Sequence, residues 1–126
     1  KAIYHSEVAI DLDPVNTLYR NNYAYSLLIN NELAKAEKEL TFLSKSISGN
    51  SYYLRNLGLL NYLRRDYTTA QNLYTSSESK DPNTALIYYY LGLNEKALGD
   101  LERAKSFFII GKKLNDGKSD KELLKL

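Results

Sequence analysis

Three stretches of the sequence hold residue types that could do chemistry, but none completes a site. A Ser/His/Asp or Cys/His set would need His5, the only histidine, or a cysteine, and the chain has no cysteine. The same shortage argues against a metal cluster of His and Cys. Asp11 and Asp13 form a carboxylate pair that could hold a cation, but a turn of the chain explains them equally well. Gly111-Lys112-Lys113 lacks the upstream glycine of a phosphate-binding loop. The sequence therefore predicts no catalytic residue, no metal ligand and no cofactor, and hence no enzyme.

The charge balance argues against nucleic acid and anionic membranes as partners. The formal net charge is +2 over 126 residues, of which 25% are charged, and this is ordinary for a globular domain. The C-terminal lysines alternate with Asp116, Asp120 and Glu122, so they do not form a basic patch. We therefore predict a protein or peptide partner.

The sequence gives little information about location. No apolar stretch approaches the length of a membrane-spanning helix and no signal-peptide pattern opens the chain, so we expect a soluble protein without direct membrane insertion. The lack of cysteine suits the cytoplasm and the periplasm equally. The start at Lys1 and the absence of methionine indicate a piece of a longer protein, and the abundance of Lys, Asn, Tyr and Ile favours a bacterial, AT-rich source.

Internal repetition is the strongest signal in the sequence. Ala36, Ala70 and Ala104 lie 34 residues apart (70 − 36 = 34 and 104 − 70 = 34), and Ala2 extends the series by one period. The same period relates Leu33, Tyr67 and Leu101; Leu40, Tyr74 and Phe108; Leu57-Gly58 and Leu91-Gly92; Asp66 and Asp100; and, over two periods, Asp13-Pro14 and Asp81-Pro82. So many matches at one period predict an array of similar structural units.

Each unit has the pattern of two helices joined by a short turn. Apolar and small residues recur at helical spacing, and Asp81-Pro82 ends one helix because proline disfavours helical geometry in the residue before it. The expected cap residues are Asp66, Asn83 and Thr84 and, at the earlier equivalent positions, Asn16 and Asn50. The predicted helices cover 17–30, 33–47, 51–64, Tyr67 to the stop at Asp81-Pro82, 85–98 and 101–114.

Small residues inside these helices predict how the two helices of a unit pack. Gly58 and Gly92 lie in mid-helix, where glycine costs about 1 kcal/mol relative to alanine. Close approach of the second helix would offset this cost, and its matching small residues are Ala70 and Ala104. In the first unit, Ala24 occupies the position that Gly58 and Gly92 hold in the later units.

The repeated residues resemble the tetratricopeptide repeat consensus in order and spacing. The matching residues are Leu57-Gly58, Asp66-Tyr67, Ala70, Tyr74, Asp81-Pro82-Asn83, Leu91-Gly92, Gly99-Asp100, Ala104, Phe108 and the end-of-repeat stretch from Ala9 to Asn16. The resemblance implies an all-α, right-handed superhelical solenoid of antiparallel helix hairpins. It also favours protein binding, because the RNA-reading pentatricopeptide repeats run one residue longer. Ser48-Gly49, in place of a proline turn, and Gly111, in place of an alanine, depart from the consensus and are expected to loosen local packing.

The repeat register divides the single domain, residues 1–126, into about seven helices and a short cap. Residues 1–16 would be the second helix of a truncated repeat, followed by full repeats at 17–50, 51–84 and 85–118. Residues 119–126 would start a capping helix, with Ser119 and Glu122 as a capping box. The truncated end should expose apolar residues, so self-association through residues 1–13 is possible.

The resemblance places the partner site on the first helix of each repeat, along a concave groove. Tyrosine offers rigid contact area with a hydroxyl, and asparagine can bond a peptide backbone as donor and acceptor. Tyr23, Tyr67, Tyr74 and Tyr88 fall at packing positions and are expected in the core, whereas either role is open for Tyr25, Tyr52, Tyr89 and Tyr90. The candidate groove residues are Asn21, Tyr25, Tyr52, Arg55, Asn56, Leu59, Tyr62, Tyr89, Tyr90, Leu93 and Lys96.

Two further expectations concern the partner. Some relatives grip the C-terminal carboxylate of chaperones with a clamp of Lys, Asn and Arg, and these positions here are Asn21, Tyr25, Asn56, Leu86 and Tyr90. Only Asn56 has suitable chemistry, so we predict no binding to acidic chaperone tails. The alternative to a docking module is a structural spacer, whose groove is filled by its own chain or by a second copy.

Overall fold

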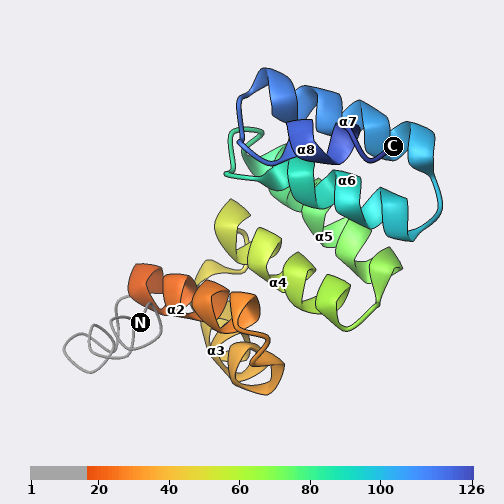
Figure 1. The fold of residues 1–126 in the computed structure, drawn as a ribbon. Helices are drawn as coiled ribbons and strands as arrows, with labels where there is room; N and C mark the ends of the chain where they lie inside the picture. The colour runs from red at the N-terminus through yellow and green to blue at the C-terminus, as the bar shows by residue number, and fades with distance from the viewer. Residues whose placement is uncertain (1–16) are drawn as a thin grey trace.

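The computed structural model describes residues 17–126, and this part of the chain is all-α (Figure 1). Its helices are α2 (Thr17–Ile29), α3 (Leu33–Ile47), α4 (Ser51–Leu63), α5 (Tyr67–Lys80), α6 (Ile87–Ala97), α7 (Leu101–Lys113) and the short α8 (Ser119–Leu123). These bounds agree with the predicted helices to within two residues. The predicted helix in residues 1–16, with its cap Asn16, lies outside the described residues.

The helices pair as three hairpins that follow one another along the molecule (Figure 1). Extensive contacts join α2 to α3, α4 to α5 and α6 to α7. The first helices also contact each other, α2 with α4 and α4 with α6, whereas the second helices α3, α5 and α7 lack comparable contacts with one another. The first helices therefore form the closer-packed layer, and α8 packs on α7 at the end of the stack.

The helix ends repeat as regularly as the sequence does. After α2, the Glu32 N–H donates to the Leu27 carbonyl at 2.8 Å and the Asn31 N–H to the Leu28 carbonyl at 3.0 Å, which is a Schellman turn. The same pair of bonds closes α4, α6 and α7. The residue in left-handed conformation at these turns is Asn31, Arg65, Gly99 or Asn115.

Two of the expected helix caps, Asn50 and Asp66, are confirmed. Asn50 accepts hydrogen bonds from the Tyr52 and Tyr53 N–H groups at 2.9 and 3.1 Å. Asp66 accepts from the Thr69 N–H at 3.2 Å, and the equivalent Asp100 accepts from the Arg103 N–H at 3.0 Å. Each bond satisfies a helix N–H that has no partner within the helix.

The start of α6 differs from the prediction, and Asn83 and Thr84 do not cap it. Asp81 binds both residues in a turn: its carboxylate accepts from the Asn83 N–H at 2.9 Å and its carbonyl from the Thr84 hydroxyl at 2.7 Å. These local bonds compete with helix formation. Leu86 then adopts a left-handed conformation with φ of 63°, and α6 begins only at Ile87.

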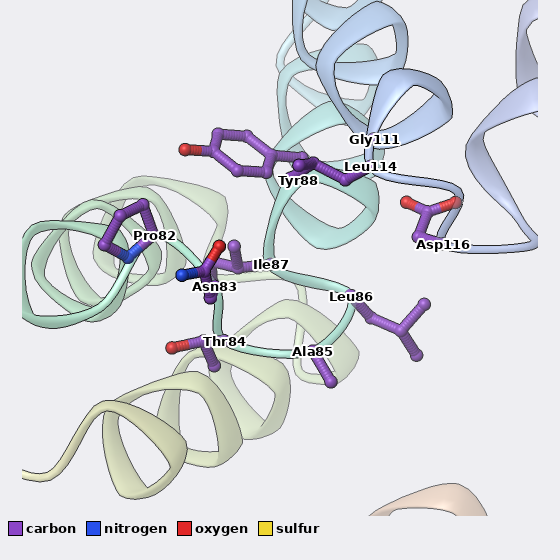
Figure 2. A pocket seen from close by; sticks show the side chains of 10 residues that line it. All are labelled: Pro82, Asn83, Thr84, Ala85, Leu86, Ile87, Tyr88, Gly111, Leu114 and Asp116. Carbon is purple, nitrogen blue, oxygen red and sulfur yellow. The ribbon is translucent and has the colours of Figure 1, made fainter.

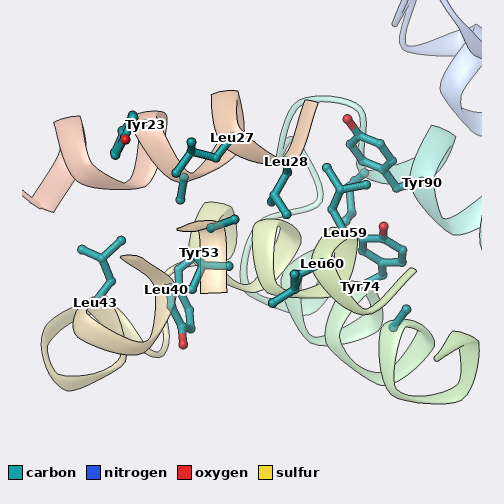
Figure 3. Close-up of a cluster of buried hydrophobic side chains, with 14 of the residues drawn as sticks. Tyr23, Leu27, Leu28, Leu40, Leu43, Tyr53, Leu59, Leu60, Tyr74 and Tyr90 are labelled. Atoms are coloured by element: carbon teal, nitrogen blue, oxygen red, sulfur yellow. The ribbon is translucent and has the colours of Figure 1, made fainter. Parts of the chain in front are cut away.

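The core runs along the stack between the two helix layers (Figure 3). Tyr23, Tyr74 and Tyr88 are buried as expected, whereas Tyr67 is half-buried and meets the Tyr62 ring edge-on at 5.6 Å. The labelled side chains of Figure 3 come from α2 to α6 and form one continuous cluster: Tyr23, Leu27, Leu28, Leu40, Leu43, Tyr53, Leu59, Leu60, Tyr74 and Tyr90.

Close approach at the mid-helix glycines is confirmed, and the atoms nearest to each glycine belong to an aromatic ring of the second helix. A Cβ on Gly58 would lie 2.7 Å from the Tyr74 ring, and one on Gly92 would overlap the Phe108 ring. The rings of Tyr74 and Phe108 therefore fill the space that each glycine leaves. Ring and glycine are complementary in volume, as expected of a close-packed interior.

Two expectations about the C-terminal end are wrong. Gly111 does not loosen packing: it is buried, and a Cβ there would overlap Ser119 and Asp116 at the turn before α8. Ser119 and Glu122 do not form a capping box. The Asp116 carboxylate accepts instead from the Ser119 N–H at 2.8 Å and from its hydroxyl, while Glu122 pairs with Lys125 at 3.1 Å.

Candidate functional site

All of the predicted groove residues lie on the first helices α2, α4 and α6, but the structure divides them into two groups. Some side chains are almost fully buried, namely Asn21, Arg55, Asn56, Leu59 and Tyr90. Others keep solvent access, with Tyr25, Tyr62, Tyr89 and Leu93 half-buried and Tyr52 and Lys96 exposed. Across both groups, the polar residues Asn21, Arg55 and Asn56 form a network, whereas most of the tyrosines and leucines line an open cavity.

The polar network lies between α2 and α4 and reaches the turn before α6. We define the Arg55 network as Asn21, Tyr52, Arg55, Asn56 and the backbone of Ala85. The Asn56 amide donates to the Asn21 carbonyl at 3.2 Å and to the Asn21 side-chain oxygen at 3.0 Å. Arg55 donates to the Asn56 side-chain oxygen at 3.0 Å and to the Ala85 carbonyl at 3.1 Å. The Ala85 N–H donates to the Tyr52 hydroxyl at 3.1 Å.

Arg55 is a buried cation without a carboxylate partner among residues 17–126. It is only 6% exposed, and its guanidinium lies 4.3 Å from the centre of the Tyr25 ring and 4.9 Å from that of the Tyr52 ring. Ring faces and carbonyl oxygens stabilise such a charge where no counter-ion is present. Asn21 and Asn56 thus bind their own chain, a role that the groove interpretation did not anticipate.

The open cavity lies farther along the same layer, where α2, α4 and α6 meet. We define the tyrosine cavity by its lining, which is apolar or aromatic except for one lysine and encloses about 270 Å³. It is lined by Tyr25, Leu28, Ile29, Leu59, Tyr62, Leu63, Tyr89, Tyr90, Leu93 and Lys118. Its composition matches that of ligand sites, which are mostly hydrophobic with a few polar groups.

Ring contacts hold the wall of the tyrosine cavity in place. The Tyr25 and Tyr90 hydroxyls share a hydrogen bond of 2.7 Å, which connects α2 to α6. Tyr90 stacks on Tyr74 of α5 with ring centres 5.8 Å apart, and Tyr89 meets Tyr90 at 5.4 Å. The wall is therefore supported from the hairpin core behind it, and this rigidity favours binding because little ordering remains to be done.

Tyr62, Tyr89 and Tyr90 of the cavity stay neutral over a wider pH range than an exposed tyrosine. Burial raises the pKa of Tyr62, Tyr89 and Tyr90, and the nearby Glu122 carboxylate adds to the effect at Tyr62 and Tyr89. Burial also holds the pKa of Tyr74 well above its usual value. The hydroxyl groups thus act as uncharged hydrogen-bonding groups.

Basic residues surround one side of the tyrosine cavity. The Lys118 ammonium lies 5.7 Å from the centre of the Tyr89 ring. The predicted groove residue Lys96 points to Glu122 of α8 at 3.8 Å, and Glu122 also pairs with Lys125. Lys118 was not among the predicted site residues, nor were Ile29 and Leu63. The fold of the chain beyond α7 brings Lys118 to the cavity, and the repeat pattern carries no signal for that fold.

A second cavity, of about 260 Å³, lies where the α5–α6 turn faces the end of α7 (Figure 2). It adjoins the late start of α6 and is lined by Pro82, Asn83, Thr84, Ala85, Leu86, Ile87, Tyr88, Gly111, Leu114 and Asp116. The Asp116 carboxylate already accepts hydrogen bonds from Lys118 and Ser119 of its own turn. This cavity draws on one loop and one helix end, and none of the predicted groove residues lines it.

The remaining chemical candidates of the sequence gain no support as a site. His5, Asp11 and Asp13 lie outside the described residues, and Lys112 and Lys113 end α7. Within residues 17–126 no group of three or more His, Cys, Asp or Glu side chains is placed to hold a metal ion. Over the same range, no helix is both long and apolar enough to span a bilayer.

A scan of family models gives no match to this chain, and a search of curated proteins gives none either.

Proposed function

We propose that this chain is a protein-binding scaffold of tetratricopeptide-like repeats, a right-handed solenoid without enzymatic activity. It holds a peptide or a segment of a partner protein along the layer of first helices. One apolar side chain of the partner enters the tyrosine cavity. The observation that carries the proposal is that all three first helices contribute to one open, rigid, mostly apolar cavity.

The size of the cavity favours a side chain over a cofactor. A volume of about 270 Å³ is below the usual range for drug-sized ligands, roughly 300–1,000 Å³, but it accommodates a large apolar side chain. Burying such a side chain contributes about 2 kcal/mol, so further contacts along α2, α4 and α6 must add to the affinity. An anchored, extended partner supplies them.

The chemistry of the cavity also favours binding over catalysis. Its ionisable lining groups are tyrosines and Lys118. A general base works best when its pKa is near the working pH, and burial moves the pKa of Tyr62, Tyr89 and Tyr90 away from neutrality. No charged group that could act as a nucleophile or base lines the cavity apart from the Lys118 amine.

A peptide selection tests the proposal. Random peptides displayed on phage are selected against the immobilised chain and then measured against two variants of α6. Leu93→Trp fills the cavity, whereas Leu98→Trp makes the same change at an exposed position of the same helix end that does not line it. We expect selected peptides to share an apolar residue and to bind Leu93→Trp at least about tenfold more weakly, equivalent to 1.4 kcal/mol, with Leu98→Trp unaffected.

The same variants separate docking from the spacer alternative. If a second copy fills the cavity, wild type is larger than a monomer in light scattering and Leu93→Trp lowers its mass. If the chain is a docking module, the mass does not change. Peptides that bind both tryptophan variants equally well would rule out the tyrosine cavity as the site. Titration with an acidic chaperone tail, for which we predict no tight binding, checks the missing clamp.

A further inference from the structure

We infer that the tyrosine cavity selects an apolar anchor that has an acidic residue beside it, and that Lys118 provides this selectivity. The inference rests on the proposed function, since it names the chemistry of the partner at the same site. It follows from the distribution of charge around the cavity.

Both cations at the cavity lack a carboxylate partner among the described residues. Arg55 lies behind the Tyr25 ring and bonds only to Asn56 and to the Ala85 carbonyl. Lys118 lies over the Tyr89 ring and forms no ion pair within residues 17–126. The cavity wall formed by Tyr25, Tyr89 and Tyr90 therefore has an uncompensated positive charge on each side.

The neighbouring carboxylates are already engaged. Glu122 pairs with Lys96 and Lys125. Asp116 accepts hydrogen bonds from the Lys118 and Ser119 N–H groups. No acidic side chain lines the cavity itself. An incoming carboxylate near Lys118 would thus meet a cation that has no ion-pair partner among residues 17–126, while the nearby Glu122 is paired with two lysines.

A cationic ligand is the obvious competing choice, because clustered tyrosine rings bind quaternary ammonium groups. Here the chain's own cations already face two of the rings, Arg55 at Tyr25 and Lys118 at Tyr89. They compete for the ring faces and repel a further positive charge. The geometry therefore favours an anionic group beside an apolar one.

Only Lys118 is placed to contact such a carboxylate directly. It is exposed, whereas Arg55 is buried and its donors face Asn56 and Ala85. An exposed ion pair contributes about 0.2–1 kcal/mol, which corresponds to roughly a 1.5- to 5-fold change in affinity. The interaction sets a preference and does not require a free C-terminal carboxylate.

The test uses three short synthetic peptides, acetylated and amidated at their ends. Each has one phenylalanine in a Gly/Ser background, flanked by Asp, by Asn or by Lys. Titrations are followed by NMR of the isotope-labelled chain, which measures weak affinities and shows whether the Tyr89, Leu93 and Lys118 amides respond. The variants are Lys118→Gln, Lys118→Glu and, as a control on exposed α7, Lys105→Glu.

For wild type we expect the Asp peptide to bind about threefold more tightly than the Asn peptide, and the Lys peptide more weakly than both. Lys118→Gln should remove the preference, Lys118→Glu should invert it, and Lys105→Glu should leave it unchanged. Added salt should reduce the preference of wild type. A preference that survives Lys118→Glu, or equal binding of the three peptides at the cavity, would overturn the inference and leave the proposed function standing. Failure of the Asn peptide to perturb the cavity amides would instead count against the anchor itself, and the charge preference would fall with it.

Discussion

The contact between α2 and α4 and the contact between α4 and α6 join equivalent helices of successive repeats, yet they differ in chemistry. The first is polar, with the Asn56 amide bonded to Asn21. At the second, which we call the aromatic contact, Tyr89 and Tyr90 of α6 stand one period after Arg55 and Asn56. Here Tyr90 bonds to Tyr25 of α2 and stacks on Tyr74 of α5. The contact between α2 and α4 is also the more extensive of the two.

The comparison shows how equivalent positions of repeated hairpins can differ in packing. Short amide side chains bond directly and hold α2 against α4, so that their polar groups are satisfied within the chain. Tyrosine rings are larger and stiff, and they leave a cavity of about 270 Å³ where α6 joins the layer. The repeat fixes where the helices lie, and the residues at two equivalent positions decide whether the contact is polar or aromatic.

The largest expected effect comes from breaking the polar contact with Asn56→Leu. The change leaves Asn21 without its donor and the buried Arg55 without one of its acceptors. Unsatisfied buried groups cost about 1–3 kcal/mol each, so we expect a loss of roughly 3 kcal/mol in the free energy of unfolding, measured by urea denaturation.

The double variant Arg55→Met/Asn56→Leu provides the control. It removes the buried charge together with its acceptor, and replacing both partners by apolar groups is far less costly than orphaning one. We expect it to recover part of the stability lost in Asn56→Leu. If the double variant loses as much free energy of unfolding as Arg55→Met and Asn56→Leu lose together, the Arg55–Asn56 hydrogen bond does not couple the two residues.

The second prediction makes the same chemical change twice at the aromatic contact, with opposite results. Tyr90→Phe removes the hydrogen bond to Tyr25 and should destabilise the fold by about 1 kcal/mol. Tyr74→Phe should stabilise it by about 1 kcal/mol, because the buried Tyr74 hydroxyl has no hydrogen-bond partner among the described residues. Phe108 already occupies the equivalent position in the next hairpin. Thermal or urea unfolding of both variants would show whether the signs differ as expected.

High pH should weaken the fold, in part through the tyrosines of the aromatic contact. Burial raises the pKa of Tyr90 and Tyr74 above the ordinary value of 10.0. Well below pH 10 both tyrosines are neutral in the folded and in the unfolded chain, so their contribution to the free energy of unfolding does not change with pH. Above pH 10 the unfolded chain loses protons that the folded chain keeps, and stability falls as pH rises. The fall should be shallower in Tyr90→Phe and in Tyr74→Phe, measured as the free energy of unfolding against pH. Equal slopes in the variants and wild type would contradict the assignment.

The helices of this fold could be predicted well because their signals are local. Asn50 and Asp66 cap the helices that follow them, and the period of the repeat transfers each helix to the next unit. The prediction for the start of α6 was wrong for an equally local reason, since Asp81 binds Asn83 and Thr84 in a turn that competes with the helix. Both outcomes depend on residues within a few positions of the helix start.

The site could be predicted only in part, because contacts between repeats decide it. Most of the tyrosines named from the sequence line one cavity. The burial of Arg55, however, depends on Tyr25 and Ala85, each 30 residues away. An arginine on a helix surface is normally exposed, so the repeat pattern gave no reason to bury it. The contact of Tyr74 with Gly58 is a similar case, since Ala70 lies on the same helix face and was equally plausible.

The smallest expected effect lies outside both contacts, at the turn after α4, and it sets a baseline for the others. Arg65 is exposed and adopts a left-handed backbone conformation with φ of 66°, where the repeat equivalent is Gly99 with φ of 90°. A side chain in this conformation costs about 1 kcal/mol, and the greater freedom of glycine in the unfolded chain offsets part of the gain. Arg65→Gly should therefore stabilise the chain by roughly 0.5 kcal/mol. Gly99→Ala should destabilise it through backbone strain alone, because the added Cβ meets no atom within 4 Å.

Because α4 belongs to both contacts, Arg65→Gly should raise the unfolding free energy of the Asn56→Leu and Tyr90→Phe variants by the same amount. A gain that differs between the two backgrounds would show that the turn couples to one contact, and that the polar and aromatic contacts do not stabilise α4 independently.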